Sequence, residues 1–292
     1  MGHFRTALVT ASLVLGAASA FAKTAEPPLV MTPASGWVVD YADESCALRR
    51  AFVAGDETAI LEMRQYGPGD QLEIALVSET LARPRRAPRV RFEPDTEWLS
   101  PTSALFVNAG TLHGILYNDD LRPEAMRPPD QPWTAWPEQD RDAREQGITG
   151  ITIADSFGRD ITLHTGKLHA PMDAMRACTQ ELTTHWGLEP AVPGPLARGA
   201  SPTGLSQWAR KVQEDYPSEM VRAGKSGRVP VRMIIGKDGR PTSCQAVGLA
   251  EQSFVEAACS SMMRYARFNP ALDGNGEPTT GSYTTTIIYQ TW

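Results

Sequence analysis

The segment Arg228–Leu249 reads RVPVRMIIGKDGRPTSCQAVGL. Its first nine residues place an apolar side chain at every second position, at Val229, Val231, Met233 and Ile235. Alternation of this kind predicts a strand with one buried face. The triplet Lys237-Asp238-Gly239 is typical of a hairpin turn, after which Pro241–Leu249 is expected to return as the neighbouring strand. The segment therefore predicts an antiparallel sheet in the last third of the chain.

Helical patterns flank this hairpin on both sides. Upstream, apolar residues recur at helical spacing, at Leu205, Trp208, Ala209 and Val212,. Pro217–Ala223 is expected to form a second short helix. Downstream, Ser253–Glu256 is a capping box that opens a third helix, and the β-branched run Tyr283–Gln290 predicts a last strand. The predicted order over residues 204–292 is helix, helix, strand, strand, helix, strand, which is an α+β domain.

Several short motifs in this region follow one another in a recognisable order. They are Tyr216-Pro217, Gly224, Gly227-Arg228-Val229, Asp238-Gly239 and Arg264–Ala271, the last of which ends in RFNPA. This combination resembles the C-terminal domain of the TonB family. Upstream, the residues from Trp37 to Cys46 and from Cys178 to Leu188 resemble the N-terminal domain of some bacterial proteins described as TonB-type energy transducers.

The resemblance implies a small antiparallel sheet backed by helices. In the family this sheet grips a short segment of an outer-membrane transporter by taking it up as an added strand. The implied docking strand is Tyr283–Gln290, and its alternation places on one side the side chains of Tyr283, Thr285, Ile287 and Tyr289,. The same strand can instead complete the core of its domain, and the sequence leaves both interpretations open. The implied partner is a protein, and the implied role needs no cofactor.

A TonB energy transducer has further parts that differ in this chain. Proteins of that kind are similar in having an uncleaved membrane helix with an in-membrane histidine and a long spacer rich in Glu-Pro and Lys-Pro. Here the early histidine is His3, which precedes the apolar run, and the stretch 189–203 is a short linker. The alternative to a transport role is an envelope structural or assembly module, whose C-terminal domain only packs or forms a homodimer.

Residues 23–188 are expected to form a separate β-rich domain. Short apolar or alternating runs such as Leu48–Val53 are separated by turn signals such as Tyr66–Asp70,. The period then changes to that of a helix over Pro171–Trp186. The proline-rich stretch 189–203 is the predicted linker to the C-terminal domain. The N-terminal domain is acidic, whereas the C-terminal domain is slightly basic.

The N-terminus predicts export. Met1–Ala22 combines His3 and Arg5, an apolar stretch, and an Ala-Phe-Ala end that suits signal peptidase,. Cleavage after Ala22 would give a periplasmic protein, and an uncleaved inner-membrane anchor is the alternative. The net charge of −6 argues against a nucleic-acid partner, because phosphate binding needs a basic surface.

The chain has four cysteines, at positions 46, 178, 244 and 259. Their spacing is not that of a zinc or redox motif, and an even number in an oxidising compartment predicts disulfides. Four cysteines allow three pairings, and the sequence alone does not choose among them. We favour Cys46–Cys178, because a bond from the predicted helix to an early strand would close the first domain. In the topology that the resemblance implies, Cys244 and Cys259 face each other.

Catalytic motifs are not evident. His113, His164, His169 and His185 are dispersed in the sequence and lack motif partners,. We therefore expect a protein that is not an enzyme. A periplasmic hydrolase is the remaining alternative, and it would require histidines or carboxylates that cluster in one pocket.

Overall fold

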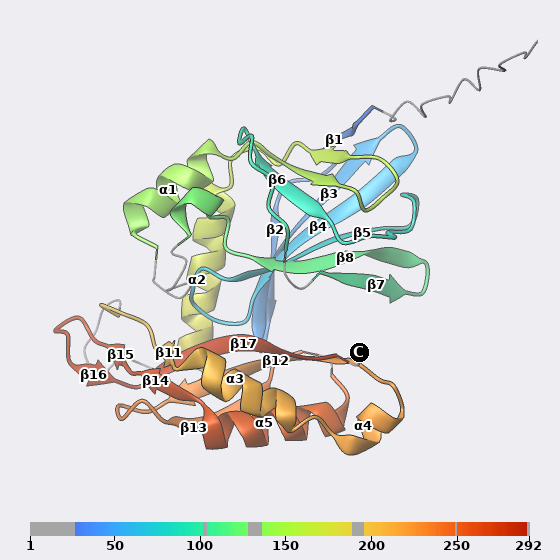
Figure 1. Cartoon of the computed structure of the whole chain (residues 1–292). Coiled ribbons are helices and arrows are strands. Elements are labelled where there is room, and N and C mark those ends of the chain that lie inside the picture. The colour runs from blue at the N-terminus through green and yellow to red at the C-terminus, as the bar shows by residue number, and fades with distance from the viewer. Residues whose placement is uncertain (1–26, 102–103, 128–135, 189–195, 249, 291–292) are drawn as a thin grey trace, which may run out of the picture.

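The protein has two parts that lie one above the other (Figure 1). The structure is a computed structural model that describes residues 27–101, 104–127, 136–188, 196–248 and 250–290. The predicted signal peptide, residues 1–22, lies outside the described residues. None of the helices in the described ranges is both long enough and apolar enough to span a membrane.

The N-terminal part is built on a ten-stranded sheet. Its strands are β1 (Leu29–Pro33), β2 (Val38–Ala42), β3 (Ser45–Ala54), β4 (Glu57–Gln65), β5 (Leu72–Ser78), β6 (Arg89–Glu93), β7 (Leu105–Ala109), β8 (Leu112–Asp119), β9 (Gly150–Ala154) and β10 (Ile161–Leu163). They follow the order β6-β9-β10-β1-β3-β4-β5-β8-β7, and β2 pairs with β3 beside this path. Of these pairs, β1 and β10 run parallel and the others antiparallel.

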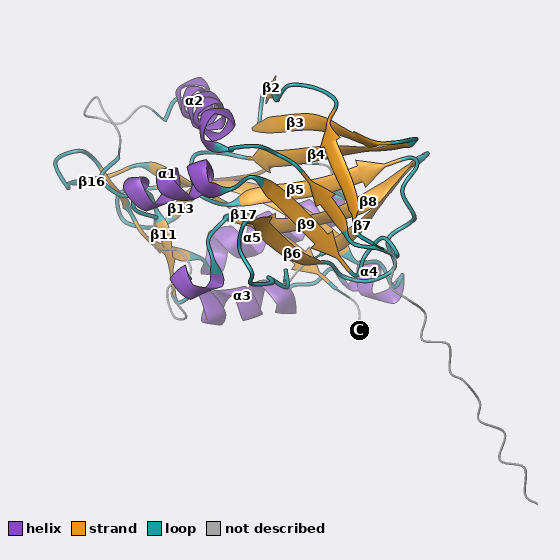
Figure 2. Cartoon of the chain, turned by 90° about the horizontal axis from the view of Figure 1, so that it is seen from above, coloured by secondary structure: helices purple, strands orange, loops and turns teal. Residues whose placement is uncertain are grey.

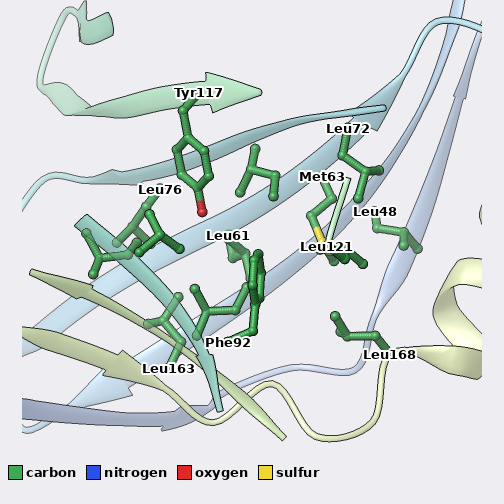
Figure 3. Close-up of a cluster of buried hydrophobic side chains, with 14 of the residues drawn as sticks. Leu48, Leu61, Met63, Leu72, Leu76, Phe92, Tyr117, Leu121, Leu163 and Leu168 are labelled. Atoms are coloured by element: carbon green, nitrogen blue, oxygen red, sulfur yellow. The ribbon is translucent and has the colours of Figure 1, made fainter. Parts of the chain in front are cut away.

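Alternation of apolar side chains builds the core of this domain. In β4, Ala59, Leu61 and Met63 are buried, while the residues between them are partly or fully exposed. Strand β5 shows the same alternation over its whole length. These side chains meet others from β3, β6 and β8 in one hydrophobic cluster (Figure 3). The domain is therefore folded around a core of its own, as its β-rich sequence predicts.

Two helices and a short 3-10 turn complete the N-terminal domain. The turn is η1 (Glu124–Met126), and the helices are α1 (Glu138–Gly147) and α2 (His169–His185). Helix α2 packs against β2 and β3 (Figure 2) and buries Met172, Met175, Cys178 and Leu182. A disulfide joins Cys178 to Cys46 on β3. The helix thus lies where the pattern of Pro171–Trp186 predicts it and is bonded covalently to the sheet.

The C-terminal domain is a three-stranded sheet, with α3 and α5 on one face (Figure 1). Its helices are α3 (Leu205–Glu214), α4 (Ser218–Arg222) and α5 (Gln252–Tyr265). Its strands are β11 (Ser201–Thr203), β12 (Gly227–Ile235), β13 (Pro241–Ala246), β14 (Arg267–Asn269), β15 (Ala271–Leu272), β16 (Pro278–Thr279) and β17 (Gly281–Tyr289). The sheet order is β13-β12-β17. A second disulfide joins Cys244 on β13 to Cys259 on α5.

Short strands at the edges of this domain depart from the predicted order. Strand β11 pairs with β14, and β15 pairs with β16. The linker predicted over residues 189–203 therefore extends too far at its C-terminal end, because Ser201–Thr203 pairs with a strand of the C-terminal domain. This strand contains Pro202 and has no alternation, so only its backbone pairing identifies it. Residues 189–195 of the predicted linker lie outside the described residues.

The hairpin turn and the RFNPA motif touch each other. The N–H of Phe268 donates a hydrogen bond of 3.0 Å to the carbonyl oxygen of Gly239. Gly239 has a φ of +75°, and a Cβ at this position would lie 2.1 Å from the carbonyl oxygen of Phe268. Both the left-handed backbone and the close approach require glycine. Two motifs that are far apart in the sequence thus form one contact of the fold.

A buried aspartate ends β8. Asp119 is 4% exposed, and it accepts hydrogen bonds from the Arg127 guanidinium at 3.1 and 3.2 Å and from the Leu121 N–H at 2.7 Å. Burial raises the pKa of Asp119 to about 6, and the attraction of Arg127 opposes this shift only in part. Folding therefore favours the protonated form of this side chain.

We expect Asp119→Asn to change how stability depends on pH. The pKa of Asp119 is about 6 in the folded protein and about 3.9 in an unfolded chain. Between these values the folded state holds a proton that the unfolded state has lost, so the free energy of unfolding falls as pH rises, by about 3 kcal/mol in total. The asparagine side chain does not bind this proton, so the stability of the variant relative to wild type should increase from pH 4 to pH 7. Urea unfolding at both pH values measures the effect, and a constant difference would contradict it.

Candidate functional site

Strand β17 has one free edge. It pairs with β12 over its full length, from Gly281 opposite Ile235 to Tyr289 opposite Gly227. In the described part of the chain no strand pairs with its other edge. In an antiparallel pair, every second residue of an edge strand points its N–H and C=O groups away from its neighbour. The predicted docking strand therefore has a backbone edge that another strand can join.

The four candidate docking residues of this strand lie on the face that turns toward the helices. Tyr283, Ile287 and Tyr289 are buried in the core of the C-terminal domain, and Thr285 on the same face is half-buried. Burial raises the pKa of Tyr283 to about 12, so its hydroxyl stays neutral at physiological pH. Tyr283, Ile287 and Tyr289 therefore complete the core, and β17 also has a backbone edge that a partner can reach.

A groove of about 720 Å³ lies between the two domains, alongside β17. On the C-terminal side it is lined by the consecutive residues from Thr280 to Thr286 and by Ile288. Consecutive residues of a strand point to opposite faces, so a surface that touches all of them runs along the edge of the strand. The other wall comes from the loop Tyr66–Glu73 and from α2. The groove therefore gives access to the backbone of β17.

The loop that forms this wall packs closely on β17. Gly67 has a φ of +156°, and a Cβ there would lie 3.2 Å from the Oγ1 atom of Thr284 and 3.6 Å from the ring of Trp186. Burial and the neighbouring charge of Glu73 raise the pKa of Tyr66, whose hydroxyl donates a 3.1 Å hydrogen bond to that carboxylate. The packing of Gly67 and the hydrogen bond between Tyr66 and Glu73, which joins the two ends of the loop, thus hold the loop in place.

Two arginines of β12 bind the N-terminal domain to the sheet. Arg228 pairs with Glu73, and Arg232 pairs with Glu44. The Arg232 guanidinium also lies 3.7 Å from the ring centroid of Trp186 and donates a 2.8 Å hydrogen bond to Gln245. Arg232 is 7% exposed and Arg228 is 18% exposed. These contacts fix the N-terminal domain against the face of the sheet opposite α3 and α5.

We expect Glu44→Gln to loosen the contact between the domains. The change leaves the buried Arg232 guanidinium without its carboxylate, and the loss of a hydrogen bond to a charged group costs about 2 kcal/mol. Because this contact joins the domains, their unfolding transitions should separate in differential scanning calorimetry. The control is Glu97→Gln, which removes a carboxylate from an exposed position of the N-terminal domain. Equal thermograms for both variants would contradict the prediction.

One histidine of the described residues groups with carboxylates. Asp142, Glu145 and His169 place one ligand atom each within 4.8 Å of one another. However, Arg176 donates to both oxygens of Glu145, at 2.7 and 3.0 Å, which makes the group an ion-pair network. His113 is buried elsewhere and its Nε2 lies 2.6 Å from the carbonyl oxygen of Leu81. The cluster is therefore a poor candidate for the pocket that a hydrolase would require.

Sequence reasoning did not find the residues that hold the N-terminal domain against β12. Glu44, Glu73 and Trp186 come from separate elements of the N-terminal domain, and they carry no spacing that links them to β12. Their role depends on how the two domains pack. The free edge of the last strand, by contrast, lies in the segment that the family resemblance indicates.

Comparison with known proteins gives one match. Residues 212–291 match the family described as Gram-negative bacterial TonB protein C-terminal. The match includes α5 and the strands of the three-stranded sheet, while β3, α2 and the loop Tyr66–Glu73 lie outside it. No curated protein and no solved structure matches the chain. The domain that defines this family is non-enzymatic and is associated with envelope transport and energy transduction. The chain therefore carries a TonB family C-terminal domain at residues 212–291.

Proposed function

We propose that this protein acts in the periplasm and binds a partner protein of the outer membrane by strand addition to β17. The observation that carries the proposal is the free edge of β17, which lines a groove and is not covered by another strand of the described chain. An extended segment placed there would pair its backbone with the outward N–H and C=O groups of β17. The function is binding in outer-membrane transport, with energy transduction as its further extension.

The C-terminal domain and the disulfides support this placement. TonB family proteins interact with outer-membrane proteins, which agrees with a protein partner. Two disulfides, one in each domain, suit an oxidising compartment such as the periplasm,. The exported form would begin at Lys23, after the predicted signal peptide.

The test uses residues 23–292 and synthetic peptides from periplasm-exposed segments of outer-membrane transporters of the same organism. We expect one or more of these peptides to bind, as measured by fluorescence anisotropy. The bound peptide is then N-methylated at single positions, because an N-methyl group removes one backbone donor. In strand addition, methylation should abolish binding at every second position and be tolerated at the positions between. If N-methylation reduced binding equally at all positions, the result would contradict strand addition.

A second candidate function is an assembly module that does not dock transporters. The contacts of Arg228 and Arg232 favour it, because they fix a whole folded domain against the sheet. In that case the transporter peptides should fail to bind. Sedimentation should then show dimers whose population rises with protein concentration.

A further inference from the structure

The groove beside β17 is rich in arginine from outside the TonB-type domain. The arginines that line it are Arg64, Arg141, Arg176 and Arg198. Two of them are already neutralised, since Arg64 pairs with Glu62 at 2.7 Å and Arg176 pairs with Glu145 at 2.7 Å. Of the other two, Arg141 lies 3.8 Å from Asp70 and from Asp142, whereas Arg198 pairs with no carboxylate of the described residues.

These two arginines make only weak contacts with the described residues. The nearest carboxylates to Arg141 are those of Asp70 and Asp142, each 3.8 Å away, which is beyond hydrogen-bond distance. The buried Nε atom of Arg141 has no hydrogen-bond partner in the described structure. Arg198 donates a 3.3 Å hydrogen bond to the carbonyl oxygen of Pro270 and is otherwise exposed. Both guanidinium groups can thus accept a carboxylate.

The acidic residues of the groove are already engaged. One carboxylate oxygen of Asp70 accepts hydrogen bonds of 3.1 Å from Arg122 and from the N–H of Trp136. Glu73 is paired with Arg228. The groove is lined by four arginines and by two carboxylate residues, Asp70 and Glu73, although the whole chain has a net charge of −6.

Both arginines lie close to the course of β17. Arg198 is two residues before Ala200, and a Cβ on Gly281 would lie 3.7 Å from the Cβ of Ala200. This contact places Arg198 near the first residue of the strand. The Arg141 guanidinium lies 3.8 Å from the carboxylate of Asp70. Asp70 belongs to the loop Tyr66–Glu73, whose Gly67 packs on Thr284. A segment that runs along β17 would therefore pass near both Arg198 and Arg141.

We propose that the groove binds an extended segment with carboxylate side chains, and that Arg141 and Arg198 bind those carboxylates. The inference rests on the proposed function, because it requires a strand docked on β17. It adds that the choice of partner is made by residues outside the matched TonB-type domain. Carboxylates form charge-assisted hydrogen bonds with guanidinium groups, which are about twice as strong as neutral ones.

The experiment compares two synthetic peptides about ten residues long, a length that suits an added strand. Both are rich in threonine and valine, which favour the extended conformation. One carries two glutamates and the other carries glutamines in their place. Residues 23–292 should bind the glutamate peptide about tenfold more tightly, the size of one good ionic contact. The preference should decline with added salt, because exposed charges are screened.

Three variants assign the preference to the groove. Arg141→Gln and Arg198→Gln should each reduce the preference severalfold and leave the affinity for the glutamine peptide unchanged. Arg141→Lys keeps the charge and should retain most of the preference. Arg85→Gln is the matched control, because it removes an exposed arginine that does not line the groove. Thermal unfolding of each variant confirms that the fold is intact.

The outcomes separate this inference from the proposed function. Equal binding of the two peptides would overturn the role of the arginines and leave strand addition standing. An effect of Arg85→Gln as large as that of Arg141→Gln would overturn it as well. If neither these peptides nor the transporter peptides bind, both the inference and the proposed function are wrong.

Discussion

Replacing both Cys46 and Cys178 with alanine should lower the free energy of unfolding of the N-terminal domain by about 5 kcal/mol. The two residues are 132 positions apart, so the bond closes a long loop and strongly restricts the unfolded chain. Both side chains are almost fully buried, at 0% and 1% exposure, and alanine fills most of their space without adding a polar group. Urea unfolding, followed by circular dichroism, measures the loss.

The second disulfide provides the matched comparison. Cys244 and Cys259 are 15 positions apart, so the same double alanine change there should cost only about 3 kcal/mol. The effect should fall on the C-terminal domain, because the bond lies within it. If the Cys244/Cys259 variant lost more free energy of unfolding than the Cys46/Cys178 variant, loop entropy would not explain the stabilisation.

Phe254→Ala should lower the free energy of unfolding of the C-terminal domain by about 4 kcal/mol. Phe254 is 1% exposed. Its ring stacks on Tyr289 at a centroid distance of 5.4 Å and meets the edge of Tyr216 at 5.8 Å. Gly227 leaves room for it, since a Cβ there would lie 2.4 Å from the Phe254 ring. The truncation leaves a cavity that these neighbours cannot close.

The control for this change is Met263→Ala on the same helix. Met263 is 37% exposed, so its truncation should cost less than about 1 kcal/mol. Because Phe254 supports Tyr289 at the end of β17, the Phe254 variant should also bind strand-adding peptides more weakly. A Phe254 variant as stable as the Met263 variant would contradict the packing described above.

Local patterns were enough to predict much of the C-terminal domain. The alternation of Arg228–Ile235 and the turn at Asp238-Gly239 act between neighbouring residues, and they form β12 and the hairpin as expected. The periodicity of Leu205–Val212 likewise gives α3. Local patterns predict Ser201–Thr203 as part of the linker, because its pairing with β14 depends on residues more than sixty positions away.

The sequence by itself indicated the β-rich character of the N-terminal region, the TonB-type domain and the segment that forms its last strand. These features depend on composition, on periodicity and on motifs that are continuous in the chain. The tertiary structure alone decided that Tyr283, Ile287 and Tyr289 enter the core and that the edge of β17 faces a groove. It also decided that Glu44 and Glu73 meet arginines of β12 across the two domains. Ion pairs between residues so far apart leave no periodic signal, since each needs only one charge at one point of the folded surface.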